Sequence, residues 1–167
     1  APFRYAVRKF AAWYYNRCAF VTAPSQSMLD ELSAYGMRRP GHVVSNHIPP
    51  DVFRPLGSTA DLKKKYAITH KAVLVFGRVA KEKNLDTALD VYERVAAKTD
   101  TELVFLGDGP YRAILEQRVR SKKLDSRVHF LGTIRGEALT EAINACDVLL
   151  ITSLSDTQSM TTLQAMA

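Results

Sequence analysis

Two cations lie in a short polar segment that follows a run of apolar residues. The segment, residues 77–84, begins with Gly77, contains Arg78 and Lys83, and ends at Asn84, where a helical pattern begins. Gly77 allows a sharp turn of the backbone, and asparagine is a residue type that caps helix N-termini. Two cations beside the positive end of a helix form an anion site that suits a diphosphate. A solvated charged loop explains the same residues, so the segment by itself leaves both interpretations open.

Two further polar segments also follow apolar runs. Residues 107–110 contain Gly107 and Gly109 followed by a proline, a tight turn with little side-chain bulk that permits close approach of a ligand. Residues 153–160 place Asp156 ahead of a helical pattern. Ordinary turn chemistry explains the first segment equally well, and a helix cap explains the second. The GxGxxG fingerprint of dinucleotide-binding proteins is absent from the sequence.

Alternating strands and helices must position these segments. Short apolar runs predict strands over residues 72–76, 102–106, 127–131 and 147–151. Helical spacing of apolar residues predicts helices over residues 85–96, 111–122 and 136–145, and from residue 160. This alternation is typical of βαβ units, so the predicted fold class is α/β, with a Rossmann-like parallel sheet and flanking helices. Ligands bind such sheets at the carboxyl ends of the strands, where the three polar segments fall.

The first part of the chain has a different organisation. Helices are predicted there over residues 4–17 and 25–35, and strands over residues 19–22 and 42–45. Gly36 is placed to end the second helix, and a capping box at Ser58 begins the next one. Three prolines within residues 46–57 predict an extended connection there. The chain is therefore divided into residues 1–45, an interdomain linker at 46–57, and a Rossmann-like domain at 58–167.

Composition excludes several classes of protein. With 167 residues, of which 47% are hydrophobic and 24% charged, the chain is typical of a globular protein. The net charge of +6 favours an anionic partner, but the cations are scattered without a nucleic-acid-binding signature, so no nucleic-acid partner is expected. Cys18 and Cys146 are interpreted as buried, reduced thiols, which suits the cytoplasm. The histidines lack metal-ligand spacing, and His129, in a predicted strand, is interpreted as structural.

The first predicted helix combines aromatic and basic side chains. They are Phe3, Arg4, Tyr5, Arg8, Lys9, Phe10, Trp13, Tyr14, Tyr15 and Arg17. Such a helix can lie on a membrane surface. It can also pack against a partner domain, which the lack of one clean aromatic stripe favours.

Taken together, the polar segments resemble the family 4 retaining glycosyltransferases in order and spacing. The resemblance is carried by residues 76–84, 106–110, 128–132 and 156–167, and upstream by 23–25, 43–46 and 53–55. In that family two Rossmann-like domains face each other across a cleft, as the GT-B architecture. The C-terminal domain holds the nucleotide-sugar donor, and the N-terminal domain supplies most of the acceptor site. The chain resembles the donor domain preceded by the last helix–strand–helix of the acceptor-side domain, so it is expected to be a fragment of a longer protein.

The resemblance implies roles for individual residues on the donor side. Arg78 and Lys83 would hold the donor diphosphate. Gly132, Thr133 and Ile134 would line the base pocket, largely through their backbone. Because the two cations would neutralise the diphosphate, neither a metal nor another cofactor is expected.

The resemblance also implies roles in the last predicted helix and the loop before it. Asp156 and Gln164 fall on two positions that are usually both glutamate; Asp156 would contact the donor sugar and Gln164 the ribose hydroxyls. Ser159 replaces a usual glycine and, with the glycines of the other loops, would allow close approach of the donor. Residues 156–158 resemble the subgroup that glycosylates lipids such as diacylglycerol.

The expected activity is transfer of a hexose from an NDP-sugar, most simply a UDP-sugar, with retention of anomeric configuration. The expected partners are the donor, a sugar or lipid acceptor, the N-terminal domain of the same protein, and a membrane contacted peripherally at its cytoplasmic face. The fragment alone is expected to be inactive. A sugar-nucleotide epimerase of related architecture is one alternative. An inert sugar-nucleotide or phosphate-binding module is another, which the departures at Asp156 and Gln164 favour.

Overall fold

The computed structural model describes residues 2–154, 156 and 158–167 and contains two compact units. The smaller unit consists of Ala1–His47 and Asp156–Met160, and the larger one of Ile48–Ser155 and Thr161–Ala167. Residues 48–57, expected to be part of a linker, therefore belong to the larger unit. There the backbone N–H of Leu56 donates to the side chain of Asn144 at 2.8 Å.

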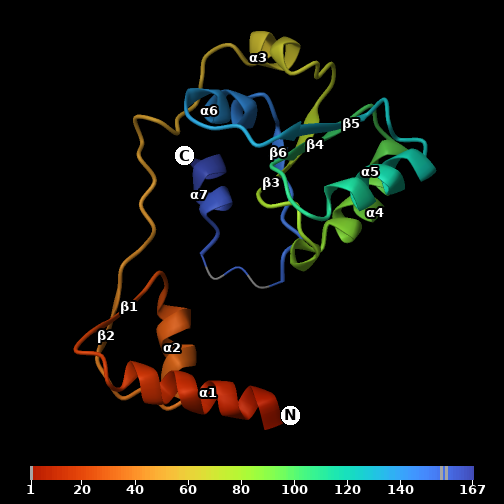
Figure 1. Cartoon of the computed structure of the whole chain (residues 1–167). Helices are drawn as coiled ribbons and strands as arrows, with labels where there is room; N and C mark the ends of the chain where they lie inside the picture. Colours follow the sequence, from red (N-terminus) through yellow and green to blue (C-terminus); the bar gives the residue numbers. More distant parts are fainter. Residues whose placement is uncertain (1, 155, 157) are drawn as a thin grey trace. The chain divides into compact units, whose positions relative to one another are not determined.

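Within the described residues, the larger unit contains a four-stranded parallel sheet (Figure 1). The strands are β3 (Ala72–Phe76), β4 (Glu102–Leu106), β5 (Val128–Gly132) and β6 (Val148–Leu149). Their spatial order is β5-β4-β3-β6, and each neighbouring pair is parallel. The predicted α/β fold class with a Rossmann-like parallel sheet is thereby confirmed.

Helices connect the strands and cover both faces of this sheet. They are α3 (Thr59–Lys65), the 3-10 helix η1 (Lys81–Lys83), α4 (Leu85–Ala96), α5 (Arg112–Ser121) and α6 (Glu137–Asn144). Helix α7 (Met160–Met166) follows the last strand. Figure 1 shows α4 and α5 on one face, and α3 and α6 on the other. Alternate residues of β4 enter the two cores: Leu103 and Phe105 pack towards α4 and α5, whereas Val104 and Leu106 pack towards α3 and α6.

Strand β6 is shorter than the five residues predicted for it. It lies at the edge of the sheet, where Val148 and Leu149 pair with β3. Ile151 is 45% exposed, whereas Leu149 and Leu150 pack into the cores on opposite faces of the sheet. Apolar residues of this run therefore pack into the cores even where they lie outside the strand, so the run is longer than β6.

Two predicted helix caps have a different geometry. The hydroxyl of Ser58 donates to the carboxylate of Asp61 at 2.5 Å, so the predicted capping box of α3 is wrong. A carboxylate is a stronger acceptor than a neutral group, so it accepts the hydrogen bond of the hydroxyl. Asn84 precedes α4 with a left-handed backbone (φ 54°), and its side-chain oxygen accepts from the hydroxyl of Thr87 at 2.9 Å. An N-cap normally has extended dihedral angles, so the predicted side-chain cap by Asn84 is also wrong.

A buried carboxylate organises the amino end of β4. The side chain of Glu102 is 4% exposed and accepts hydrogen bonds from the backbone N–H of Thr69 (2.8 Å), its hydroxyl (2.7 Å) and the backbone N–H of His70 (2.8 Å). It is also hydrogen-bonded to Nε2 of His129. Burial alone would raise the pKa of Glu102, but these hydrogen bonds outweigh it and lower the pKa to about 2. The interpretation of His129 as a structural residue is confirmed.

The smaller unit has a helix–strand–helix–strand order. Its elements are α1 (Pro2–Tyr15), β1 (Val21–Ala23), α2 (Gln26–Ala34) and β2 (Gly41–Val43). Strands β1 and β2 are parallel. The hydroxyl of Ser25 caps α2 by accepting from the N–H of Met28, and Gly36, with φ +105°, follows its end, as predicted.

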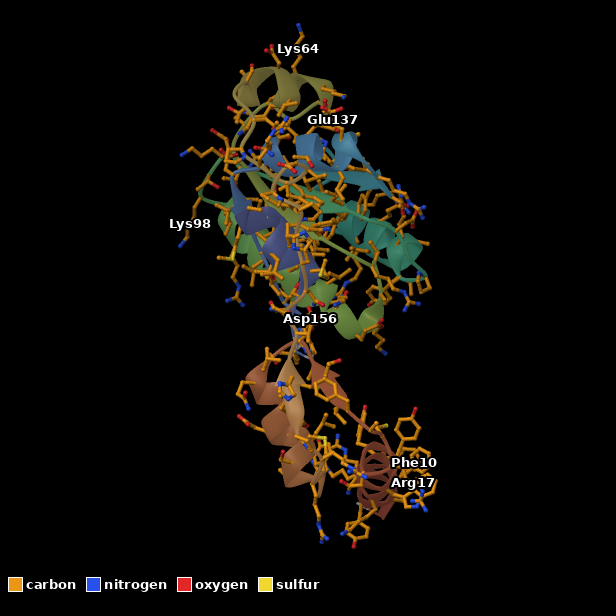
Figure 2. All side chains as sticks on the ribbon, turned by 90° about the vertical axis from the view of Figure 1, so that its left-hand side faces the viewer. Phe10, Arg17, Lys64, Lys98, Glu137 and Asp156 are labelled. Atoms are coloured by element: carbon orange, nitrogen blue, oxygen red, sulfur yellow. The ribbon has the colours of Figure 1, made fainter. Side chains whose placement is uncertain are left out.

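Helix α1 exposes most of its aromatic side chains. Ala12 is buried, whereas Phe3 is 78% exposed and Phe10 65% exposed (Figure 2). The Arg17 guanidinium lies over the ring of Trp13, 4.1 Å from its centre. These exposed side chains agree with both hypotheses, a partner domain and a membrane surface. In the described part of the chain, no helix is both long enough and apolar enough to cross a bilayer.

The two cysteines are unpaired and half-buried, not fully buried as expected. The thiol of Cys18 approaches the carbonyl of Tyr14. Burial raises the pKa of Cys146 to about 12, and this thiol stays protonated at neutral pH.

Candidate functional site

Three loops of the larger unit meet at the carboxyl edge of the sheet. The loops that follow β3, β4 and β5 line one cavity of about 200 Å³. Its lining residues are Phe76, Gly77, Arg78, Leu106, Gly107, Asp108, Thr133 and Ile134. Complete ligand pockets occupy roughly 300–1,000 Å³, so this cavity matches a part of a large ligand.

The strand order places this cavity where open α/β sheets bind ligands. From β3 the chain passes outward to β4 and then to β5, and it returns to form β6 on the other side of β3. The order therefore reverses at β3, and a crevice forms at such a switch point beyond the carboxyl ends of the strands. Gly77 and Arg78 directly follow β3, so they lie at this point.

Glycines bring the first two loops together. Gly77 and Gly107 have φ values of +128° and +138°, which side chains rarely allow. A Cβ at Gly107 would lie 2.0 Å from the carbonyl oxygen of Gly77, and one at Gly109 would lie 2.3 Å from that of Val79. These residues were predicted to allow close approach of a ligand. The structure shows close approach between the loops themselves, which a short-range sequence pattern does not reveal.

One side of the cavity is basic. Arg78 lines it, is 66% exposed, and pairs with Glu82 at 3.5 Å, an exposed contact that a competing anion can displace. Lys83 lies at the end of η1, where its backbone carbonyl accepts from the hydroxyl of Thr152 at 3.0 Å. The loop thus presents a guanidinium at the carboxyl end of β3, with a second cation five residues further along.

Asp108, which also lines the cavity, belongs to an ion-pair chain that the sequence pattern did not indicate. Arg112 donates to Glu116 at 2.7 Å and to Asp108 at 3.3 Å. The bond to Glu116, followed by the charge of Asp108, raises the pKa of Arg112. The guanidinium lies over Phe130 and 3.4 Å from the place that a Cβ of Gly132 would take. This chain fixes the turn after β4 beside the turn after β5.

Apolar residues complete the cavity. Phe76 and Leu106 are the last residues of β3 and of β4, and Ile134 follows β5. Phe76 and Leu106 were predicted to lie in strands but were not predicted to belong to the site. Each is the last residue of its strand and precedes a glycine, and this position could have indicated that they belong to the site.

The remaining predicted residues lie in several places. The carbonyl of Gly132 accepts from the N–H of Gly107 at 2.8 Å, so it supports the cavity. Gln164 lines a separate cavity of about 290 Å³ together with Phe53 and Asn144. Asp156 and Ser159 belong to the smaller unit. The roles expected for Gln164, Asp156 and Ser159 stay predictions.

In the part of the chain that the structure describes, no three His, Cys, Asp or Glu side chains gather as they would around an ion.

Comparisons with known proteins agree with this geometry. The chain is 29% identical over 154 residues to alpha-monoglucosyldiacylglycerol synthase of Streptococcus pneumoniae, covering 88% of this chain and 35% of that protein. It is 27% identical over 152 residues to N-acetyl-alpha-D-glucosaminyl L-malate synthase of Bacillus anthracis, covering 88% and 39%. The crystal structure of Anabaena HepE with UDP and glucose superposes with a TM-score of 0.84 at 21% identity, over 99% of this chain and 47% of that one. The chain thus spans less than half the length of these proteins.

A family model supplies the remaining comparison. The model described as Glycosyl transferases group 1 matches residues 70–167, which is more than half of the chain and includes all three loops of the cavity. The fold shared with HepE is the Rossmann-like domain of GT-B transferases. The chain therefore belongs to the group 1 glycosyl transferases.

Proposed function

We propose that this chain forms the donor side of an enzyme that transfers a hexose from a UDP-sugar to an acceptor with retention of anomeric configuration. One observation carries the proposal: the loops after β3, β4 and β5 converge at the switch point of a parallel sheet, with Arg78 facing their cavity. The same three segments carry the resemblance to the retaining glycosyltransferases. The Anabaena neighbour was crystallised with UDP and glucose, which supports a nucleotide sugar as the ligand.

The donor diphosphate would be held by Arg78 and Lys83. Two cations can offset the charge that develops on a departing nucleoside diphosphate, so we propose that no metal is required. The base would lie against the backbone of Thr133 and Ile134, beside Gly132. Gln164 would reach the ribose, although in this structure it lines the neighbouring cavity.

The donor sugar would contact Asp156, and the acceptor would be bound by the N-terminal domain, of which the smaller unit is a part. A lipid acceptor is supported by the name of the Streptococcus relative, a diacylglycerol glucoside synthase. It is also supported by the exposed aromatic and basic side chains of α1, which suit peripheral contact with a membrane. The Bacillus relative is named for a malate acceptor, so acceptor identity is a separate question from donor binding. The unpaired cysteines suit the cytoplasmic side of that membrane.

A product assay on the full-length protein tests this function. UDP-glucose would be supplied with diacylglycerol in mixed micelles or with L-malate, and the anomeric configuration of the product would be read by proton NMR. We expect an α-glucoside from the α-linked donor. A β-glucoside would contradict retention. An altered UDP-sugar formed without acceptor would identify an epimerase, and UDP binding without turnover of any donor or acceptor would identify an inert module.

A further inference from the structure

Gln158, in the loop that contains Asp156, is hydrogen-bonded to the segment that follows β2. Its amide oxygen accepts from the backbone N–H of Asn46 at 2.8 Å, and its amide nitrogen donates to the hydroxyl of Ser45 at 2.7 Å. The side chain of Asn46 donates in return to the backbone carbonyl of Gln158 at 3.3 Å. Two segments 112 residues apart in the sequence are thus joined by three hydrogen bonds.

The receiving segment is itself well anchored. Strand β2 pairs with β1, and the N–H of Val44 extends this pairing by donating to the carbonyl of Ala23 at 2.9 Å. Ser45 and Asn46 follow directly, so Gln158 is attached to the carboxyl end of the small sheet. A primary amide offers a donor and an acceptor, and Gln158 uses both on this one segment.

The attachment lies within the smaller unit. Asp156 and Gln158 belong to the smaller unit, whereas the loops that would hold the diphosphate belong to the larger unit. Asp156 is exposed and lies two residues before Gln158. Loss of the Gln158 bonds would therefore loosen the attachment of the Asp156 loop to the segment after β2 without touching Arg78 or the base pocket.

We propose that Gln158 is a positioning residue for transfer: it holds the loop that carries Asp156 to the segment after β2 and thereby orients the carboxylate that would contact the donor sugar. The inference rests on the proposed function, in which Asp156 contacts that sugar. It assigns to Gln158 an effect on the rate of transfer and no effect on nucleotide affinity.

The test compares Gln158→Met with the parent in the full-length protein. Methionine has a similar length and offers neither the amide donor nor the amide acceptor. We expect kcat for transfer from UDP-glucose to the acceptor found in the product assay, followed as UDP release, to fall about tenfold. The Kd for UDP, from calorimetry, should stay within twofold. Hydrogen exchange of the amides in residues 152–162 is expected to become faster, while exchange in β3–β5 does not change. Gln117→Met on the exposed surface of α5 is the matched control and should leave all three quantities unchanged.

A second variant separates positioning from a general loss of folding. Ser45→Ala removes one of the three bonds, so we expect a smaller loss of kcat, and the double variant should lose no more than Gln158→Met alone. Multiplicative losses would overturn the proposal, as would a kcat within threefold of the parent for Gln158→Met. A parallel loss of UDP affinity would overturn it too, because Gln158 would then support donor binding. If the parent binds no UDP, the proposed function fails, and the exchange experiment still reports whether Gln158 holds the loop.

Discussion

Replacing Gly107 by alanine is expected to lower the free energy of unfolding by roughly 2–6 kcal/mol, the sum of a strained backbone and an overpacked contact. The φ of Gly107 is +138°, and its new Cβ would lie 2.0 Å from the carbonyl oxygen of Gly77. To relieve this clash, the loops after β3 and β4 must separate, and their separation would also open the proposed nucleotide cavity. Urea denaturation followed by circular dichroism measures the first effect, and UDP titration measures the second.

Two other glycines separate the two causes. Gly136 has φ +64° but open space around its Cβ position, so Gly136→Ala carries backbone strain alone and should cost about 1–3 kcal/mol. Gly57 has open space and no positive φ, and Gly57→Ala should change stability by no more than about 1 kcal/mol. Equal destabilisation by Gly107→Ala and Gly136→Ala would show that the contact between the loops is not tight.

The variant Glu102→Gln is expected to be destabilised by about 3 kcal/mol at pH 7. The pKa of Glu102 lies at about 2 in the folded chain, against an ordinary value of 4.5, and each pKa unit corresponds to about 1.4 kcal/mol. A glutamine retains one acceptor oxygen where the carboxylate accepts from Thr69, His70 and His129, and its amide protons would face those donors.

The effect has a defined pH dependence. Because folding lowers the pKa of Glu102, its contribution is fully present above pH 4.5 and is lost as the pH falls towards 2. The difference in unfolding free energy between the parent and Glu102→Gln should therefore shrink over that range. Glu82→Gln is the control, because Glu82 is 57% exposed and should change stability by no more than about 0.5 kcal/mol. A Glu102→Gln deficit that is independent of pH would assign the effect to packing and not to charge.

Local patterns predicted much of the fold. The strands at residues 72–76 and 102–106 and the helix at 85–96 coincide with β3, β4 and α4, because buried parallel strands are continuously apolar and amphipathic helices repeat every 3.6 residues. The convergence of Gly77, Gly107 and Thr133 followed from the parallel topology, since the carboxyl ends of such strands share one edge.

Contacts between residues far apart in the sequence could not be predicted from such local patterns. The approach of Gly107 to Gly77, the chain from Asp108 through Arg112, and the attachment of Gln158 to Asn46 each join residues whose proximity depends on tertiary packing. The cap at Asn84 failed for a related reason. Residue type favours a cap, but the left-handed backbone that follows η1 directs the side chain to Thr87.

Calorimetric titration of UDP into the parent and into Arg78→Ala tests the central claim, that the loops at the carboxyl edge of β3–β5 hold a nucleoside diphosphate. Hydrogen bonds to charged groups contribute about 1.5–3 kcal/mol, and 1.4 kcal/mol is tenfold in affinity. We predict that Arg78→Ala binds UDP at least about tenfold more weakly, while Arg94→Ala, an exposed arginine of α4, binds it like the parent. Equal affinity of the parent and Arg78→Ala would contradict the account.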